Sequence, residues 1–165
     1  MSVIKKDYYK TFHDSVRVSF GKIATDYGLQ LEPVDEGSFK LPLKGFEIKI
    51  DLGFGHLADV NVLIAPTNDQ QQQRNLPGIG LLNFVEYQNP NFSFIDLRLR
   101  EPEELPQKLE VLSRLLRKSC DSFLRGDFSI WPKMVAFVED KIRCREKGRH
   151  RKKLFEGSTR PSTLT

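Results

Sequence analysis

Three histidines and two cysteines are the side chains of this 165-residue chain best suited to acid–base, nucleophilic or metal chemistry near neutral pH. His13 is followed by Asp14, His56 lies three residues before Asp59, and His150 lies in a basic tail. No two histidines are four residues apart, and no His, Cys or carboxylate spacing matches a zinc or iron pattern. We therefore expect no metal and no cofactor. A small enzyme using His56 and Asp59 is the weaker alternative, since a turn hydrogen bond is the commoner role for such a pair.

The cysteines also differ in their surroundings. Cys120 falls on an apolar stripe and is expected to be a small buried hydrophobe. Cys144 lies between Arg143 and Arg145, which would lower its pKa at an exposed site; an incidental surface thiol is the alternative. Neither has a histidine partner indicated by sequence, and two cysteines cannot form a disulfide framework. Glycine pairs in GFGH and PGIG do not join a strand to a helix as a phosphate loop does, and we predict no enzyme.

The C-terminal segment holds most of the positive charge. Residues 141–165 carry nine Lys or Arg and two Asp or Glu, a net charge of +7, whereas the other 140 residues carry −3. Dense basic side chains bind phosphate backbones by releasing counterions, so this segment is the candidate polyanion interface; a solvated helix end is the alternative. If the segment is helical, Lys141, Arg145 and Arg149, four positions apart, line one face. The candidate binding residues are Lys141, Arg143, Arg145, Lys147, Arg149, Arg151, Lys152 and Lys153.

The elements that would position these side chains follow from hydrophobic periodicity. An apolar residue at every third or fourth position predicts a helix over 5–27, ended by Gly28. Alternation then predicts strands over 29–34, 38–43, 46–52 and 58–65, and the short loops between them require antiparallel pairing. FEIKIDL is the clearest strand, with one apolar and one polar face. Segment 79–87 is expected to form a short helix, and segment 92–99 an edge strand.

Helical periodicity returns at Pro102. A stripe from Leu105 to Phe123 predicts one continuous helix, and a further helix is expected from Trp131 onward. Between them, Arg125-Gly126-Asp127 has the composition of an integrin-binding tripeptide, but its position favours a helix stop at Gly126 followed by a capping Asp127. This tripeptide is therefore interpreted as a corner between two helices.

Together these elements predict an α+β domain over 1–145 and a basic, flexible tail over 146–165. The antiparallel meander of three to five strands would be covered on one face by the first helix and the 105–123 helix. No leader-like apolar segment opens the chain, and no run approaches the roughly 20 apolar residues of a membrane helix, so a cytoplasmic protein without a membrane partner is expected.

Two segments, LEVLSRLLRKSCDSFLRGDFSIWPKM and FEIKIDLGFGHLADVNVLI, resemble parts of small uncharacterised bacterial α+β proteins, some of which are similar to toxin-associated immunity proteins. The likeness covers about residues 29–137. It implies a non-catalytic protein-interaction module of immunity-like or regulatory type, whose partner is another protein, and it supplies no catalytic residues. Binding of nucleic acid or another polyanion through the basic tail is the alternative function.

Overall fold

The computed structural model describes residues 3–67, 78–93 and 95–157, and gives the backbone path alone for residues 3, 4 and 148–157. The predicted α+β class is confirmed. The elements in chain order are α1 (Val3–Tyr27), β1 (Glu32–Asp35), β2 (Ser38–Leu43), β3 (Phe46–Phe54), β4 (Ala58–Pro66), β5 (Ile79–Gly80), α3 (Leu81–Gln88), β6 (Arg98–Leu99), the 3₁₀ helix η1 (Pro102–Glu104), α4 (Leu105–Ser119), α5 (Asp121–Leu124) and α6 (Trp131–Gly157).

The sheet is an antiparallel meander in the order β1-β2-β3-β4-β5, and β6 also pairs with β4. Its register places Ile48 opposite both Leu41 and Ile64, so the alternating apolar residues of three strands share one face. Pro42 is tolerated inside β2 because it lies beyond the last residue that pairs with β1. The predicted meander is therefore confirmed.

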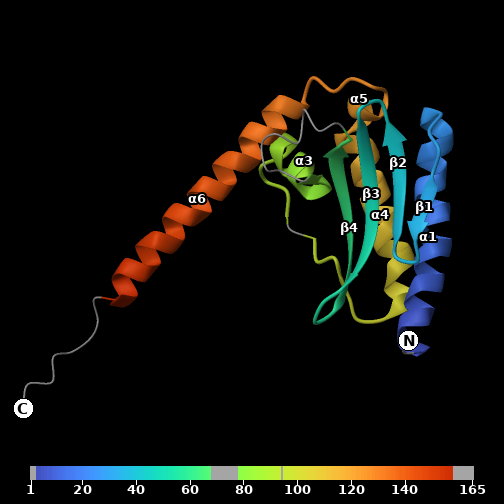
Figure 1. The fold of residues 1–165 in the computed structure, drawn as a ribbon, viewed down its shortest axis with the longest axis horizontal. Coiled ribbons are helices and arrows are strands. Elements are labelled where there is room, and N and C mark those ends of the chain that lie inside the picture. The colour runs from blue at the N-terminus through green and yellow to red at the C-terminus, as the bar shows by residue number, and fades with distance from the viewer. Residues whose placement is uncertain (1–2, 68–77, 94, 158–165) are drawn as a thin grey trace, which may run out of the picture.

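Helices α1 and α4 form one layer over the apolar face of the sheet, as the sequence predicts (Figure 1). They run side by side in the same direction, since Asp26 near the end of α1 forms an ion pair with Arg117 near the end of α4. Phe12, Phe20 and Leu112 are fully buried between these helices and the strands. The opposite, polar face of β2, β3 and β4 carries no described helix (Figure 1).

An aromatic cluster closes one end of this core. The ring of Phe46, at the start of β3, lies 5.0 Å from those of Phe123 and Trp131 and 4.7 Å from that of Phe128. Trp131 is the first residue of α6, so the cluster joins the sheet to α5, to the corner and to the start of the last helix. Trp131, Met134 and Val135 are buried, as predicted.

The corner at Gly126 confirms the structural interpretation of the Arg-Gly-Asp tripeptide. Gly126 has a φ of 91°, a left-handed conformation in which glycine is least strained. Asp127 then accepts a hydrogen bond from the backbone N–H of Ser129 at 3.0 Å, which caps the turn before α6. Gly28 ends α1 in the same left-handed manner, with a φ of 65°.

Several predicted elements were wrong in extent: β1 covers Glu32–Asp35 and not 29–34, and Ile79–Gly80 forms β5 ahead of α3. The helix expected from Pro102 to Phe123 begins as 3₁₀ and breaks at Cys120, whose φ of −127° and ψ of 23° leave the helical region. At the break the Ser119 carbonyl accepts a hydrogen bond from Gln88 Nε2 of α3, a contact between residues 31 positions apart. Of the described residues over 92–99, only Arg98 and Leu99 form a strand, β6, and the Asp96 carboxylate accepts a local hydrogen bond from the Arg98 backbone N–H.

Candidate polyanion interface

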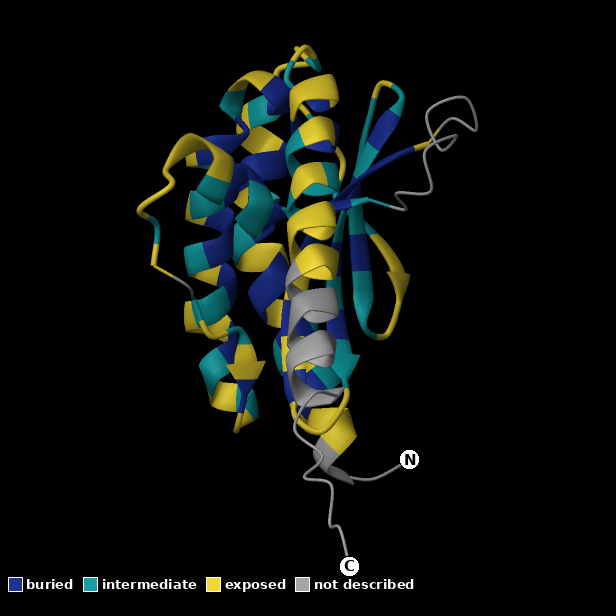
Figure 2. Ribbon diagram, turned by 90° about the vertical axis from the view of Figure 1, so that its left-hand side faces the viewer, coloured by how far each residue is buried: buried dark blue, intermediate teal, exposed yellow. Residues whose placement is uncertain are grey.

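Helix α6 has a packed beginning and an exposed continuation. The Phe137 ring packs edge-on against Tyr87 of α3, with the ring centroids 5.4 Å apart. Every residue over 142–147 is exposed, including Ile142, which the sequence placed on the apolar side of this helix. Beyond this point α6 extends away from the α+β body to Gly157 (Figure 1). The burial colours of Figure 2 show the same change along the helix.

Lys141 lies where α6 leaves the body. Its Nζ donates to Glu86 Oε2 at 2.5 Å and to Asn83 Oδ1 at 3.1 Å, both on α3. It also lies 5.3 Å from the centre of the Phe137 ring, within the range of a cation–π contact. Although the sequence places Lys141 among the polyanion-binding residues, its ammonium group is held by α3. Lys141 therefore orients α6 and supplies little free charge.

The predicted basic residues further along α6 are differently placed. Arg143 forms an ion pair with Asp140 at 3.1 Å, but both side chains are more than 60% exposed, so the pair is weak and easily exchanged. Arg145 and Lys147 are exposed. The backbone of the remaining four candidates belongs to α6, but their side chains lie outside the described residues, as does that of His150; these candidates are Arg149, Arg151, Lys152 and Lys153.

The residues considered for catalysis do not converge. His56 is exposed in the loop between β3 and β4, while Asp59 packs so closely over Gly53 that a Cβ there would lie 2.5 Å from Asp59 Oδ1. Of the hydrogen bonds between described residues, none joins His56 to Asp59. His13 instead bonds the Glu36 carbonyl through Nε2 at 3.0 Å. In the described ranges no group of three or more His, Cys, Asp or Glu side chains could hold a metal.

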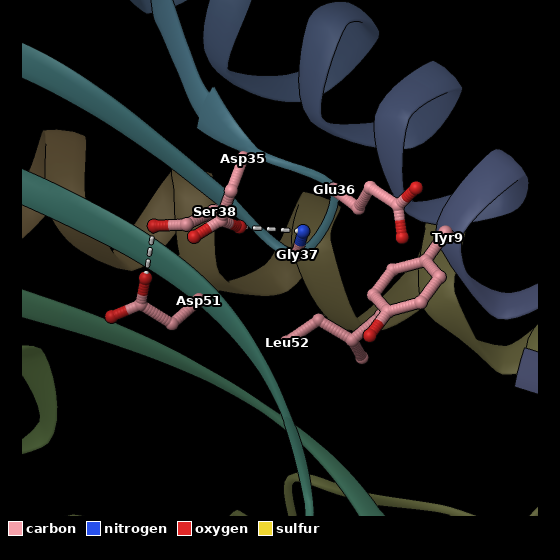
Figure 3. A pocket seen from close by; sticks show the side chains of 7 residues that line it. All are labelled: Tyr9, Asp35, Glu36, Gly37, Ser38, Asp51 and Leu52. Carbon is pink, nitrogen blue, oxygen red and sulfur yellow. Dashed lines mark hydrogen bonds between the residues drawn. The ribbon is translucent and has the colours of Figure 1, made fainter. Parts of the chain in front are cut away.

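A polar pocket of about 450 Å³ lies at the turn between β1 and β2, and sequence reasoning missed it (Figure 3). The Asp35 carboxylate accepts a hydrogen bond from the Gly37 backbone N–H at 2.8 Å, and Ser38 Oγ donates a hydrogen bond to Asp51 Oδ1 at 2.5 Å. These two carboxylates therefore already stabilise the turn and the strand pair. The signal that could have found the pocket is the pairing register that places Ser38 opposite Asp51.

No protein-family model matches the chain, and searches of curated proteins and solved structures gave no match either. Among the helices of the described residues, none combines the length and the apolar character needed to cross a bilayer. The geometry and charge of α6 and of the open sheet face are therefore the features that indicate a function.

Proposed function

We propose that this protein binds nucleic acid through the phosphate backbone, using the basic part of α6 as its contact. The observation that carries the proposal is that α6 leaves the body after Lys141 with all described side chains over 142–147 exposed, among them Arg143, Arg145 and Lys147. Within 142–147 only Ile142 and Cys144 are uncharged, and the three basic side chains face solvent, so an anionic partner is the ligand that suits this stretch.

The charge of the remainder of α6 supports this assignment. Residues 142–157 hold seven Lys or Arg and two Glu. Alternating basic positions place positive charge around most of the helix circumference, which suits contact with phosphates and not the reading of base edges. Affinity should therefore depend strongly on salt and weakly on sequence. Seven phosphate contacts would give a slope of log K against log salt of about −6 on duplex DNA.

The test is fluorescence anisotropy with labelled duplex DNA and with single-stranded RNA, measured over a salt series. We expect binding at low salt with little sequence preference, and we expect truncation after Ile142 to abolish it while the melting temperature stays nearly unchanged. A triple change of Arg143, Arg145 and Lys147 to Gln should reduce affinity and flatten the salt slope. The matched control changes Lys6, Lys10 and Arg17 to Gln, removing the same charge from exposed positions of α1.

The control distinguishes a defined surface from net charge. Equal losses in the two triple variants would mean that overall charge alone drives binding, which contradicts the proposal. The absence of binding at low salt would also contradict it, as would preferential binding to an acidic protein or to vesicles of anionic lipid.

The open face of the sheet favours a second candidate, the immunity-like protein-interaction module that the sequence resemblance implies. Lys40 and Lys49 face each other across β2 and β3, each with its own carboxylate partner, Glu32 at 3.2 Å and Glu47 at 2.9 Å. Beside them Asn61 is exposed on β4. A flat surface with alternating charges suits a protein partner with complementary charges.

This candidate has its own test. The product of a neighbouring gene, purified and titrated by calorimetry, should bind the wild-type protein and the chain truncated after Ile142 equally well. Asn61→Arg should weaken that binding, because the substitution places a bulky charge on the open face. Binding that requires residues after Ile142, or that tolerates Asn61→Arg, would assign the partner to a different surface.

A further inference from the structure

A groove of about 750 Å³ runs between the outer surfaces of α1 and α4, on the side of the helix layer that faces away from the sheet. Its floor includes Ile23, and Val18 stands on its rim with 78% of its surface exposed, the highest value among the exposed large hydrophobic residues of the described chain. The charged residues that line the groove are Asp14 and Lys22 from α1 and Glu110, Arg114 and Arg117 from α4.

Acidic and basic side chains are separated along this groove. Asp14, Val18 and Lys22 follow one another at intervals of four on α1, so they lie in a line along one helix face. On α4, Glu110 precedes Arg114 and Arg117. Because the two helices run in the same direction, both acidic residues lie toward one end of the groove and the three basic residues toward the other.

Pairing within the chain leaves most of this charge available. The Glu110–Arg114 contact is long, at 3.9 Å, and both side chains are more than 60% exposed. Arg117 is bound by Asp26 at 2.6 Å, so it contributes less. Lys22 and Asp14 are exposed. The groove therefore presents a negative end and a positive end, separated by the exposed Val18.

We propose that this groove is the contact surface for a second copy of the same chain. A twofold axis through Val18, perpendicular to α1, would place the two copies antiparallel, with Asp14 and Glu110 of each facing Lys22 and Arg114 of the other. Such a surface is self-complementary, as a twofold interface requires. The Val18 side chains would meet at the axis, and the buried Ser15 and Ser113 beside them leave room for close helix approach.

The rest of the molecule is compatible with this arrangement. In Figure 1, α6 leaves the body on the side away from α1, so the groove and the α6 extension are separate surfaces. The dimer would carry two basic helices, each free to bind. This inference does not depend on nucleic-acid binding, because it concerns a different surface and has a different readout.

The experiment measures the oligomeric state of the full chain by sedimentation velocity over a wide range of concentration. We expect a monomer–dimer equilibrium that Val18→Asp abolishes, since the substitution would bury two carboxylates together at the axis. Asp14→Lys or Lys22→Glu alone should raise the dimer Kd by about tenfold or more, because symmetry creates each like-charge contact twice. The double variant carrying both changes should recover much of the dimer, because position 14 of each copy again faces an opposite charge at position 22 of the other.

Val34→Asp is the matched control, because Val34 is also an exposed valine, at 56%, but lies on β1. It should leave the dimer unchanged, and circular dichroism should show that all variants remain folded. A wild-type chain that is monomeric at every concentration would overturn the proposal. A dimer that tolerates Val18→Asp, or a double variant that fails to recover, would assign self-association to another surface.

Discussion

At the scale of single residues, burial makes two chemically identical thiols behave differently. Cys120 is 1% exposed at the break between α4 and α5, and removal from water raises its pKa to about 12, because the charged thiolate is disfavoured there. Cys144 is exposed on α6. Since thiolate is the reactive form, the prediction that Cys120 serves as a small buried hydrophobe is confirmed, and Cys144 is the accessible thiol.

Thiol labelling should therefore count one reactive cysteine in the native protein. With a chromogenic disulfide reagent at pH 8, we expect a fast phase of one thiol per chain, and a second only after denaturant is added. Cys144→Ser should remove the fast phase and leave the melting temperature unchanged. Two fast thiols in the native wild type would contradict the burial of Cys120.

A second residue-scale effect concerns acid stability. The Asp96 carboxylate accepts hydrogen bonds from the Arg98 guanidinium at 2.8 and 2.9 Å and from its backbone N–H, and these contacts lower its pKa from 3.8 to about 2. Because the pKa is lower in the folded than in the unfolded chain, the ionised carboxylate stabilises the fold at pH values above the unfolded pKa. That contribution is lost as the pH falls from about 4 toward 2.

We therefore expect Asp96→Asn to flatten the dependence of unfolding free energy on pH between about 4 and 2, relative to wild type. Urea unfolding at a series of pH values measures this slope. Arg98→Gln is the control: it keeps the carboxylate but removes the guanidinium, and it should reduce the slope in the same direction. An unchanged slope in both variants would show that this pair has no effect on acid stability.

At the scale of elements, glycine has opposite effects on stability at two positions. Gly126 has a φ of 91° at the corner before α6, whereas Gly21 lies inside α1. A Cβ at either position would have no neighbour within 4 Å, so packing contributes equally little to the two substitutions. Backbone conformation alone should determine the sign of each effect.

Gly21→Ala should stabilise the protein by about 0.5–1 kcal/mol, because alanine is the better helix former. Gly126→Ala should destabilise it by about 1–2 kcal/mol, because the left-handed conformation strains a side chain. Thermal or urea unfolding of the two single variants measures both values. Changes of the same sign would contradict the assignment of the corner.

At the scale of the whole molecule, one aromatic cluster joins segments far apart in the chain. Phe46 contacts the rings of Phe123, Phe128 and Trp131, so the beginning of β3 packs against residues about 80 positions later. Phe46 is 3% exposed. Its loss would open a cavity where the sheet, α5 and α6 meet.

Phe46→Ala should cost about 3–5 kcal/mol of unfolding free energy, and it should also alter the fluorescence of the neighbouring Trp131 in the native state. Val34→Ala, which shortens an exposed side chain on β1, should change stability by less than about 0.5 kcal/mol and leave the fluorescence unchanged. A cost near that of the control would show that the cluster does not join the sheet to the last helix.

The local features of this protein follow from its sequence alone. Alternation in FEIKIDL predicts β3 and its buried face, the stripe through Phe12 and Phe20 predicts α1, and Gly28 and Gly126 mark the helix ends. These features depend on propensities and periodicities within a few residues, which is why the order of the elements and the identity of the core could be predicted. The basic character of α6 is likewise a property of composition.

Contacts between distant residues decided the rest. The predicted helix breaks at Cys120, next to the Ser119 carbonyl that binds Gln88, and α6 leaves the body where Lys141 meets Glu86, 55 positions earlier. The groove between α1 and α4 exists because these two helices, which are separated in sequence by all the strands, lie side by side and parallel. Sequence periodicity shows which face of a helix is apolar, but not which other helix will lie beside it. Only the tertiary structure brings Asp14 and Glu110 to one end of a groove and Lys22 and Arg114 to the other, because their proximity results from how the two helices pack on the sheet.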